Sequence, residues 1–335
     1  MEPFTAELIV ESYLHGVRID SFLVKHFRSY TPYRMQRLVR AGQVKIEGTT
    51  ARSDDRVYEG QVVRVRLLEP PDNLMPPEPM PLDIVYEDAW LIVLNKPAGI
   101  VVHPCGMWSD GALTNALQHH FDQQTQLRGL LRPGVVHRLD RLTSGVIVLT
   151  KDHLSHRRLS IGFQSGLVTK TYLALVHGVV EQDRGLIDLP IGGMVGGGTI
   201  RRSVEDDAED TRESQTRYEV VERFARHSLV RCQPLTGRLH QIRVHMAGIG
   251  HPVLADEFYS SSPTFRRSEI PGGSNADAEA ESDEPPLLDR QALHAHTLKF
   301  QHPITKHPIA VEAPLAADMQ AALDVLLESR LQAAP

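Results

Sequence analysis

Six prolines within the twelve positions 70–81 are the feature that most constrains the fold of this 335-residue chain. Proline fixes its own φ angle and has no amide hydrogen, so neither a helix nor a central strand can continue through such a segment. The segment is therefore predicted to be a stiff linker. It divides the chain into an N-terminal domain (1–69), a linker (70–82) and a larger C-terminal domain (83–335).

The N-terminal domain shows two short helical patterns followed by two strand patterns. Apolar side chains recur at helical spacing over residues 19–27. Thr31-Pro32 then predicts the start of a second helix, with the threonine as N-cap and the proline at the first helical position. Alternating apolar and polar residues predict strands at 43–47 and 61–68. Together these elements form a small independent unit.

This unit is locally basic although the whole chain has a formal net charge of −6. Residues 13–52 hold eight Lys and Arg against two acids, and local charge governs binding to phosphates. Three arginines spaced three apart share one face of the second helix. A solvated helix face is the alternative interpretation. The helix pair and the strand that follows resemble the S4 RNA-binding domain, which implies RNA contacts through Arg34, Arg37, Arg40 and Lys45.

The C-terminal domain mixes strand and helix patterns without a repeating strand–helix–strand rhythm. We therefore predict an α+β fold with a mixed, mainly antiparallel central sheet and flanking helices. Residues 260–286 are rich in Ser, Pro, Gly, Ala and acids, and are predicted to be a disordered insertion. Strands are expected at 84–86, 91–94, 100–102, 135–137, 146–150, 168–176, 216–224, 228–233 and 293–300, and helices at 111–121, 153–163, 238–247 and 316–332.

The most informative stretch runs from His137 to Gly145, between two predicted strands of β-branched residues. It places Asp140 between two arginines, Arg138 and Arg141. An aspartate in such a loop can accept backbone hydrogen bonds and close a turn, or it can act as a nucleophile. The residue types alone leave both interpretations open.

Residues 137–145 resemble the active-site motif of the RluA family of pseudouridine synthases. Segments 94–104, 170–178, 235–245 and 250–259 are similar to further motifs of that family and occur in the same order. The resemblance covers about residues 83–315, and many members carry an S4-like domain in front. It implies the pseudouridine synthase fold and the isomerisation of uridine to pseudouridine in structured RNA, after the base is extruded from its stack.

The resemblance also implies roles for individual residues. Asp140 would be the nucleophile, attacking either C6 of the uracil or C1′ of the ribose, and Arg243 would compensate its charge in a buried ion pair. Tyr172 would stack on the uracil and assist proton removal from C5. Arg138 would fill the vacated space or hold the adjacent phosphate. Further substrate contacts are assigned to His137, Arg141, Thr143, Arg238, His240 and Gln241.

The reaction involves no redox change, hydrolysis or group donor, so no cofactor is expected. None of the 17 histidines shows metal-ligand spacing, and no metal is expected. We expect a monomer that binds RNA and not DNA. No apolar run approaches 18 residues, so we expect no contact with a membrane. Two cysteines and the absence of a secretory signal favour the cytoplasm.

Several alternatives remain at this point. The S4-like domain favours large-subunit ribosomal RNA, whereas the Cys105 turn resembles family members that act on transfer RNA. A non-catalytic RNA-binding or ribosome-assembly factor could share the fold, but it would have no reason to keep Asp140, Tyr172 and Arg243 together. A glycoside or nucleoside hydrolase usually needs a second carboxylate as general acid, and none lies beside these motifs.

Overall fold

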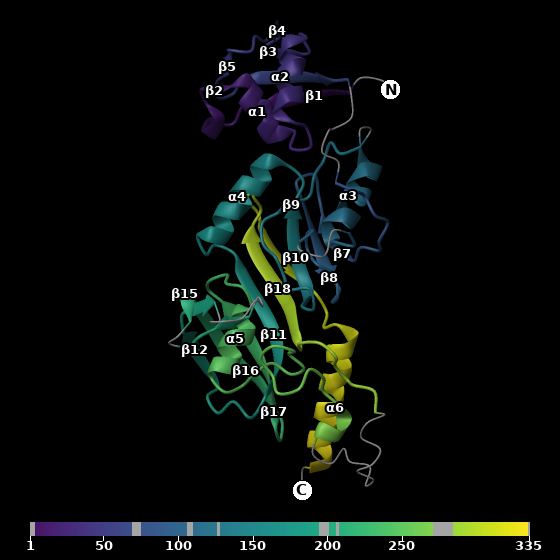
Figure 1. Cartoon of the computed structure of the whole chain (residues 1–335), viewed down its shortest axis with the longest axis vertical. Coiled ribbons are helices and arrows are strands. Elements are labelled where there is room, and N and C mark those ends of the chain that lie inside the picture. The colour runs from purple at the N-terminus through teal and green to yellow at the C-terminus, as the bar shows by residue number, and fades with distance from the viewer. Residues whose placement is uncertain are drawn as a thin grey trace.

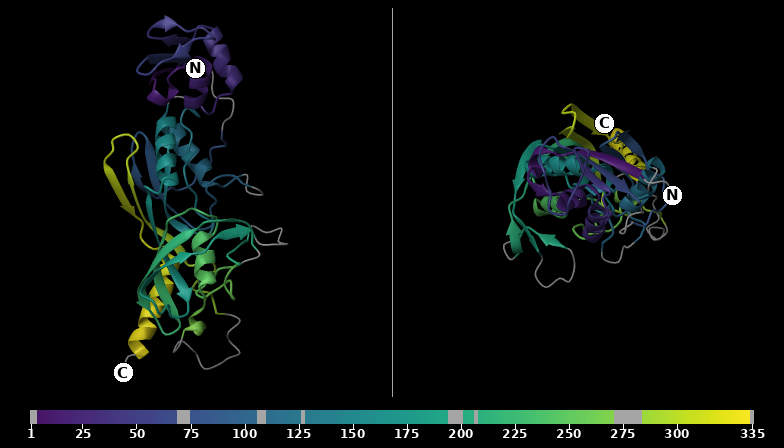
Figure 2. Two further views of the ribbon diagram at one scale, coloured as in Figure 1. Left: turned by 90° about the vertical axis from the view of Figure 1, so that its left-hand side faces the viewer. Right: turned by 90° about the horizontal axis from the view of Figure 1, so that it is seen from above.

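The computed structural model describes residues 4–68, 75–105, 110–125, 128–193, 201–205, 208–270 and 284–333. Its elements divide into two bodies that follow one another along the long axis of the molecule, and the ends of the chain lie toward opposite ends of that axis (Figures 1 and 2). Each body has its own hydrophobic core. No helix within the described ranges is long and apolar enough to cross a membrane.

The smaller body is a four-stranded antiparallel sheet, in the order β1-β6-β3-β4, that shares its core with two helices. Phe22, Met35 and Val65, from both helices and the sheet, are fully buried in this core. The elements are β1 (Phe4–Ile9), η1 (Ser12–Leu14), β2 (Val17–Arg18), α1 (Ile19–His26), α2 (Pro32–Arg40), β3 (Val44–Ile46), β4 (Thr49–Thr50), β5 (Arg56–Val57) and β6 (Val62–Leu67).

Local signals in this body are confirmed. Thr31 caps α2, its Oγ1 accepting a hydrogen bond from the backbone amide of Arg34 at 3.3 Å, and Pro32 is the first helical residue. Glu47 and Gly48 have φ angles of 48° and 80°, as the two-residue turn between β3 and β4 requires. The sequence analysis does not predict β1, which pairs with β6, more than 50 residues away along the chain.

The larger body is built on a ten-stranded sheet with the path β12-β16-β17-β11-β18-β10-β8-β7, β19 pairing with β18 and β9 with β10. Only β10 and β18 are parallel among its described pairs, so the predicted mixed, mainly antiparallel sheet is confirmed. The strands are β7 (Ile84–Glu87), β8 (Leu91–Lys96), β9 (Gly134–Val135), β10 (Ser144–Thr150), β11 (Thr169–His177), β12 (Arg184–Asp188), β16 (Gln215–Arg223), β17 (His227–Pro234), β18 (Leu293–Gln301) and β19 (Pro308–Glu312).

A small three-stranded sheet, called the flap below, consists of β13 (Ile191–Gly193), β14 (Arg202–Ser203) and β15 (Glu209–Arg212). Figure 1 shows it beside the helix that follows β17. The helices of the larger body are α3 (Leu113–Gln124), α4 (His153–Gln164), α5 (Gln241–Gly248), η2 (Arg267–Glu269) and α6 (Ala317–Ala333). The four α-helices begin within three residues of the predicted starts, and α4 begins at the predicted residue.

Two predicted strands differ in the structure. Residues 100–102 form no strand, because the carbonyls of Val101 and Val102 accept hydrogen bonds from the first amides of α3. The strand expected at 135–137 is confined to β9, because His137 is turned toward the sheet and its Nε2 accepts the backbone amide of Val148 at 3.1 Å. Side-chain and helix-capping contacts therefore replace strand pairing at both places.

The helix expected from residue 238 begins only at Gln241. His240, which precedes it, has a left-handed φ of 57°, which no α-helix tolerates in its interior. Residues 236–240 form a turn that is closed by the Gln241 side chain, whose Oε1 accepts the backbone amide of Arg238 at 2.9 Å. The apolar periodicity of the segment does not reveal this turn.

The prediction of a disordered insertion at 260–286 is wrong for its described parts. Phe265 and Ile270 are buried in the main core, and the backbone of Phe265 forms a bridge with that of Leu288. Two apolar anchors suffice to order this part of the segment, although its average composition is polar. Residues 271–283 lie outside the described residues.

The two bodies contact each other through α4 and through Leu130 and Arg132. The guanidinium of Arg28, just after α1, lies 2.9 Å from Nδ1 of His153 and 3.4 Å from Nδ1 of His156. The Arg157 guanidinium lies over the ring of Tyr13 at 4.2 Å. A basic helix of the larger body therefore borders the smaller one directly.

The parallel crossing of β10 and β18 brings the two halves of the large sheet together. Gly145 in β10 pairs with Ala295 in β18 and has a φ of +111°. A Cβ atom at this position would lie 2.2 Å from the carbonyl oxygen of Ala295. Only glycine allows the backbones to approach so closely.

We expect Gly145→Ala to lower the free energy of unfolding by at least about 3 kcal/mol, because it adds both backbone strain and a clash. Urea unfolding measures this difference. Gly162→Ala in α4 is the matched control, since its Cβ would meet only Val168 at 3.7 Å and alanine favours a helix. Equal stabilities of the two variants would contradict the role of Gly145.

Candidate active site

The loop between β9 and β10 presents Asp140. The loop closes through its backbone, the amide of Thr143 donating to the carbonyl oxygen of Asp140 at 3.1 Å. The turn therefore leaves the Asp140 carboxylate available. That carboxylate, whose side chain is 20% exposed, accepts a hydrogen bond to Oδ2 from Nη1 of Arg243 at 3.0 Å. The predicted ion pair is thus confirmed.

A buried lysine holds this loop in place. Lys96, at the end of β8, is fully buried, and its Nζ donates to the carbonyls of Pro97, Ile100 and Arg141 at 2.7, 3.0 and 3.1 Å. Burial, with the nearby Arg290 charge, lowers the pKa of Lys96 to about 7. The residue after the candidate nucleophile is therefore fixed to the opening turn of the larger body.

Arg290 holds the other end of the loop. It is 4% exposed, donates to the carbonyl of Leu142 at 3.0 Å and to Oγ of Ser144 at 3.3 Å, and pairs with both carboxylate oxygens of Asp318 at 2.6 and 2.7 Å. The buried side chains of Lys96 and Arg290 thus fix consecutive carbonyls, at residues 141 and 142. The loop that carries Asp140 is therefore held from both sides by buried hydrogen bonds.

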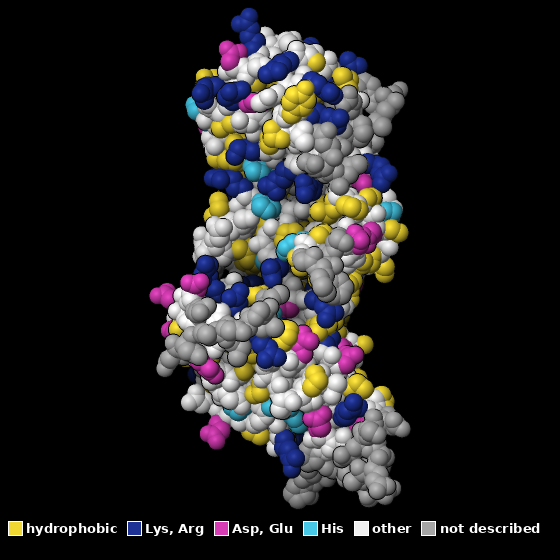
Figure 3. Space-filling model, in the orientation of Figure 1, with side chains coloured by type: hydrophobic (Ala, Val, Ile, Leu, Met, Phe, Trp, Pro, Cys, Tyr) yellow, Lys and Arg dark blue, Asp and Glu magenta, His cyan; other side chains and the backbone are white. Residues whose placement is uncertain are grey.

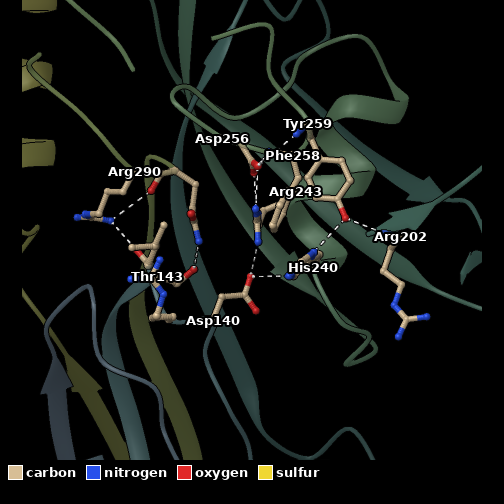
Figure 4. Close-up of polar contacts among 12 residues, drawn as sticks. Asp140, Thr143, Arg202, His240, Arg243, Asp256, Phe258, Tyr259 and Arg290 are labelled. Atoms are coloured by element: carbon tan, nitrogen blue, oxygen red, sulfur yellow. Dashed lines mark hydrogen bonds and ion pairs between the residues drawn. The ribbon is translucent and has the colours of Figure 1, made fainter. Parts of the chain in front are cut away.

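Arg243 is itself held by a second carboxylate, that of Asp256 (Figure 4). Its Nε donates to Oδ2 of Asp256 at 2.6 Å and its Nη2 to Oδ1 at 2.8 Å, a bidentate pair. The exposed fractions of the Arg243 and Asp256 side chains are 3% and 0%. Burial lowers the pKa of Arg243, but Asp256 and Asp140 outweigh it and the pKa is raised. Arg243 is a permanent cation aimed at Asp140.

Aromatic side chains pack against this ion pair. The Arg243 guanidinium lies 5.4 Å from the ring of Phe258 and 5.3 Å from that of Tyr259. His240 stacks on Phe258, and its two ring nitrogens face different partners: Nδ1 lies 3.0 Å from the Tyr259 hydroxyl and Nε2 lies 3.9 Å from Oδ2 of Asp140. Burial lowers the pKa of His240 to about 4, so its imidazole is neutral at pH 7.

Tyr172 lies on β11 and is 9% exposed. A β-bulge between Thr171 and Tyr172 interrupts the pairing of β11 with β18, so the regular alternation of side chains ends at this position. Burial and then the charge of Asp140 raise the pKa of its phenol. The hydroxyl is therefore protonated at neutral pH, within electrostatic reach of the candidate nucleophile.

The residues predicted to contact the substrate differ in their exposure and in their hydrogen-bond partners. Arg138 and Arg238 are exposed, and Arg238 also donates to the carbonyl of Glu213 at 3.2 Å. Thr143 is buried, with its Oγ1 accepting from Gln291 at 3.3 Å. The position of Arg141 is set by its carbonyl, which accepts from Lys96.

Two predicted contacts face away from Asp140. His137 stacks on Phe163 of α4, with ring centroids 4.5 Å apart, and burial lowers its pKa to about 3. Gln241 is 5% exposed and hydrogen-bonds Thr236, Arg238 and strand β16. Both side chains make contacts that stabilise the fold around the site, and their predicted contact with the substrate stays a prediction.

Sequence reasoning assigned no role to four residues that build the site: Lys96, Asp256, Tyr259 and Arg290. Asp256 and Tyr259 lie in segment 250–259, and the similarity of that segment to a family motif is the signal that could have indicated them. Tyr259 follows three residues later, and the backbone amides of Phe258 and Tyr259 donate to Oδ1 of Asp256 at 3.0 and 3.3 Å. One short segment therefore supports both Arg243 and His240.

Among the described residues, no group of three or more His, Cys, Asp or Glu side chains is arranged to hold a metal ion. The surface of the molecule carries clusters of positive charge. Figure 3 shows Lys and Arg side chains gathered over the smaller body and around its junction with the larger one. Such a surface attracts a polyanion.

Comparisons with known proteins agree with this geometry. Residues 90–248 match the model of a family described as RNA pseudouridylate synthase. The chain is 36% identical to "Uncharacterized RNA pseudouridine synthase YlyB" of Bacillus subtilis, over 90% of this chain and 91% of that protein. It is 34% identical to "Ribosomal large subunit pseudouridine synthase D" of Xylella fastidiosa, over 97% and 93%. The solved structure of "Human RNA Pseudouridylate Synthase Domain Containing 1" is similar, with a TM-score of 0.54, 27% identity and coverage of 77% and 98%.

Replacing Asp256 by Asn is expected to lower the free energy of unfolding by about 3 kcal/mol, because it breaks a fully buried ion pair while the shape is kept. Urea unfolding tests this. Asp183→Asn is the matched control, because Asp183 pairs with Arg223 at 2.6 Å but is 85% exposed. A loss in Asp256→Asn no larger than in the control would show that the buried pair adds no stability.

Proposed function

The chain belongs to the RNA pseudouridylate synthase family, and we propose that it acts on a uridine of large-subunit ribosomal RNA. The chain isomerises uridine to pseudouridine in RNA. The choice of ribosomal RNA is supported by relatives such as that of Xylella fastidiosa, whose name specifies the large ribosomal subunit and which aligns over 97% of this chain. That alignment extends over the smaller body as well as the larger one.

The observation that carries the chemistry is the Asp140 carboxylate held by Arg243 at 3.0 Å. The reaction breaks the C1′–N1 bond of uridine, turns the base and joins C1′ to C5, from which a proton leaves. A carboxylate suits this sequence because it can bond reversibly to an electrophilic carbon and then leave. We assign that role to Asp140. The guanidinium of Arg243 pairs with this carboxylate and holds its position.

Tyr172 and Arg138 complete the proposed site. The phenol of Tyr172, buried and protonated, offers a ring on which the extruded uracil can stack, worth about 1–3 kcal/mol. Burial and the charge of Asp140 raise the pKa of the phenol, so it stays protonated at neutral pH, and we assign the stacking role to Tyr172. Arg138 is exposed two residues from Asp140, where its long side chain can reach the RNA around the extruded nucleotide.

We further propose that residues 1–69 form an S4-like RNA-binding domain. Arg37 and Arg40 are exposed on α2, and Lys45 is exposed on β3. Tyr33, on the same helix, is 72% exposed. Arg34 is half-buried beside them. One chain supplies Asp140, Tyr172 and Arg243 together, which supports action as a monomer, and a ribosomal RNA substrate supports a cytoplasmic location.

Tritium release from RNA labelled at C5 of uridine tests the reaction, because isomerisation replaces that hydrogen. We expect the wild type to release tritium from large-subunit ribosomal RNA and not from transfer RNA, and Asp140→Asn to release none. Asp188→Asn, which alters an exposed carboxylate bonded to Gln215, should retain wild-type activity. Full activity of Asp140→Asn would contradict the nucleophile assignment. Release from transfer RNA alone would contradict the proposed substrate.

Replacing Arg34, Arg37 and Arg40 together by Gln tests the RNA-binding role of the smaller body. We expect weaker binding to ribosomal RNA and a slope of log affinity against log salt that falls by about 2–3, since each phosphate contact contributes about 0.7–0.9. Filter binding at several salt concentrations measures this. Arg64→Gln is the control, because Arg64 already pairs with Glu7 at 2.6 Å. An unchanged slope in the triple variant would contradict the proposal.

A further inference from the structure

Two side chains approach the same carboxylate oxygen of Asp140. Nη1 of Arg243 lies 3.0 Å from Oδ2, and Nε2 of His240 lies 3.9 Å from that atom. The Arg243 guanidinium also pairs with Asp256, so Asp140, Arg243 and Asp256 together contain two carboxylates and one permanent cation. A second hydrogen-bond donor at Oδ2 would therefore stabilise the anion further, and it would leave Oδ1 free to react.

The hydrogen of the His240 ring has a defined place. The nitrogen that faces a carboxylate is favoured to carry the hydrogen, because a lone pair there would repel the oxygen. Nε2 faces Asp140, so Nδ1 is left as an acceptor for the Tyr259 hydroxyl at 3.0 Å. That hydroxyl accepts the backbone amide of Arg202 at 2.9 Å through another lone pair, which leaves its own hydrogen for Nδ1.

The surrounding structure keeps His240 in this orientation. Its left-handed backbone (φ 57°) is a conformation that non-glycine residues adopt rarely and that is concentrated at functional positions. Its ring stacks on Phe258, with centroids 5.7 Å apart. Tyr259 belongs to the segment that Asp256 anchors, and Arg202 belongs to the flap. Figure 4 shows the chain of contacts from Arg202 through Tyr259 and His240 to Asp140.

We propose that His240 is a second positioning residue for Asp140, donating from Nε2 to Oδ2, and that the Tyr259 hydroxyl fixes the required tautomer. This inference rests on the proposed nucleophilic role of Asp140. The 3.9 Å separation is longer than a hydrogen bond, and such contacts shorten when the substrate complex forms. Because Arg243 and His240 both bind Oδ2, Oδ1 is left as the attacking oxygen. The flap is connected to the site by the backbone amide of Arg202, which donates to the Tyr259 hydroxyl.

Histidine side-chain nitrogen NMR at pH 7 tests the tautomer without any substrate. In the wild type we expect Nε2 of His240 to carry the hydrogen and Nδ1 to be bare. In Tyr259→Phe we expect this preference to weaken. His240→Asn assigns the signal by its loss. A wild-type His240 with its hydrogen on Nδ1, or with both nitrogens protonated, would overturn the proposal.

Single-turnover tritium release tests the effect on the reaction. We expect His240→Phe, which keeps a ring but has no donor, to lower the rate constant about 10- to 100-fold, as for one hydrogen bond to a charged group. His240→Gln keeps a donor and should recover part of the rate. The RNA concentration at half-maximal rate should be nearly unchanged in both, because the lost contact is to Asp140.

Tyr259→Phe should lower the same rate constant less, and it should cost nothing further when added to His240→Phe, because Tyr259 acts through His240. Tyr218→Phe, another buried tyrosine, whose hydroxyl meets Gln182 at 3.4 Å, should behave as the wild type. Additive losses in the double variant, or a change in RNA affinity alone, would overturn the proposal. If the wild type releases no tritium, the proposed function fails, and the tautomer measurement alone decides the state of His240.

Discussion

The buried arginine between two carboxylates is the interaction on which the rest of the site depends. A guanidinium that is 3% exposed is stable only where anions meet its donors, and Asp256 meets two of them in a bidentate pair. Because this pair fixes the plane of the guanidinium, it also directs an N–H of Nη1 toward Oδ2 of Asp140. Asp256 thus positions the proposed nucleophile, Asp140, through Arg243.

The fold places these groups from three separate parts of the chain. Asp140 comes from the loop before β10, Arg243 from α5 and Asp256 from the segment after it. Gly145 allows β10 and β18 to cross closely, and Lys96 and Arg290 hold the backbone of the Asp140 loop from two sides. Since these supports are buried and hydrogen-bonded, the site is preorganised and needs no rearrangement of its own backbone to present the carboxylate.

Features that depend on contacts between residues close together in the sequence were predictable from the sequence alone. Thr31 and Pro32 start a helix through contacts within three residues, and the structure confirms them. The pairing of Asp140 with Arg243 spans 103 residues and was predictable only through the resemblance to a family. Asp256 and Tyr259 were assigned no role, and His240 was expected to contact the substrate without its left-handed backbone being foreseen, because these arrangements arise from tertiary contacts that no periodicity records. Phe265 and Ile270 show the converse, since both are buried although the composition of residues 260–286 predicts disorder.

The most direct test of this account is a crystal structure of the protein bound to a short ribosomal RNA stem-loop that contains the uridine it modifies. The account predicts an extruded uridine stacked on Tyr172, with Oδ1 of Asp140 toward the base or ribose and Oδ2 held by Arg243. A uridine that remains stacked within the RNA, or an Asp140 carboxylate turned away from both Arg243 and the nucleotide, would contradict it.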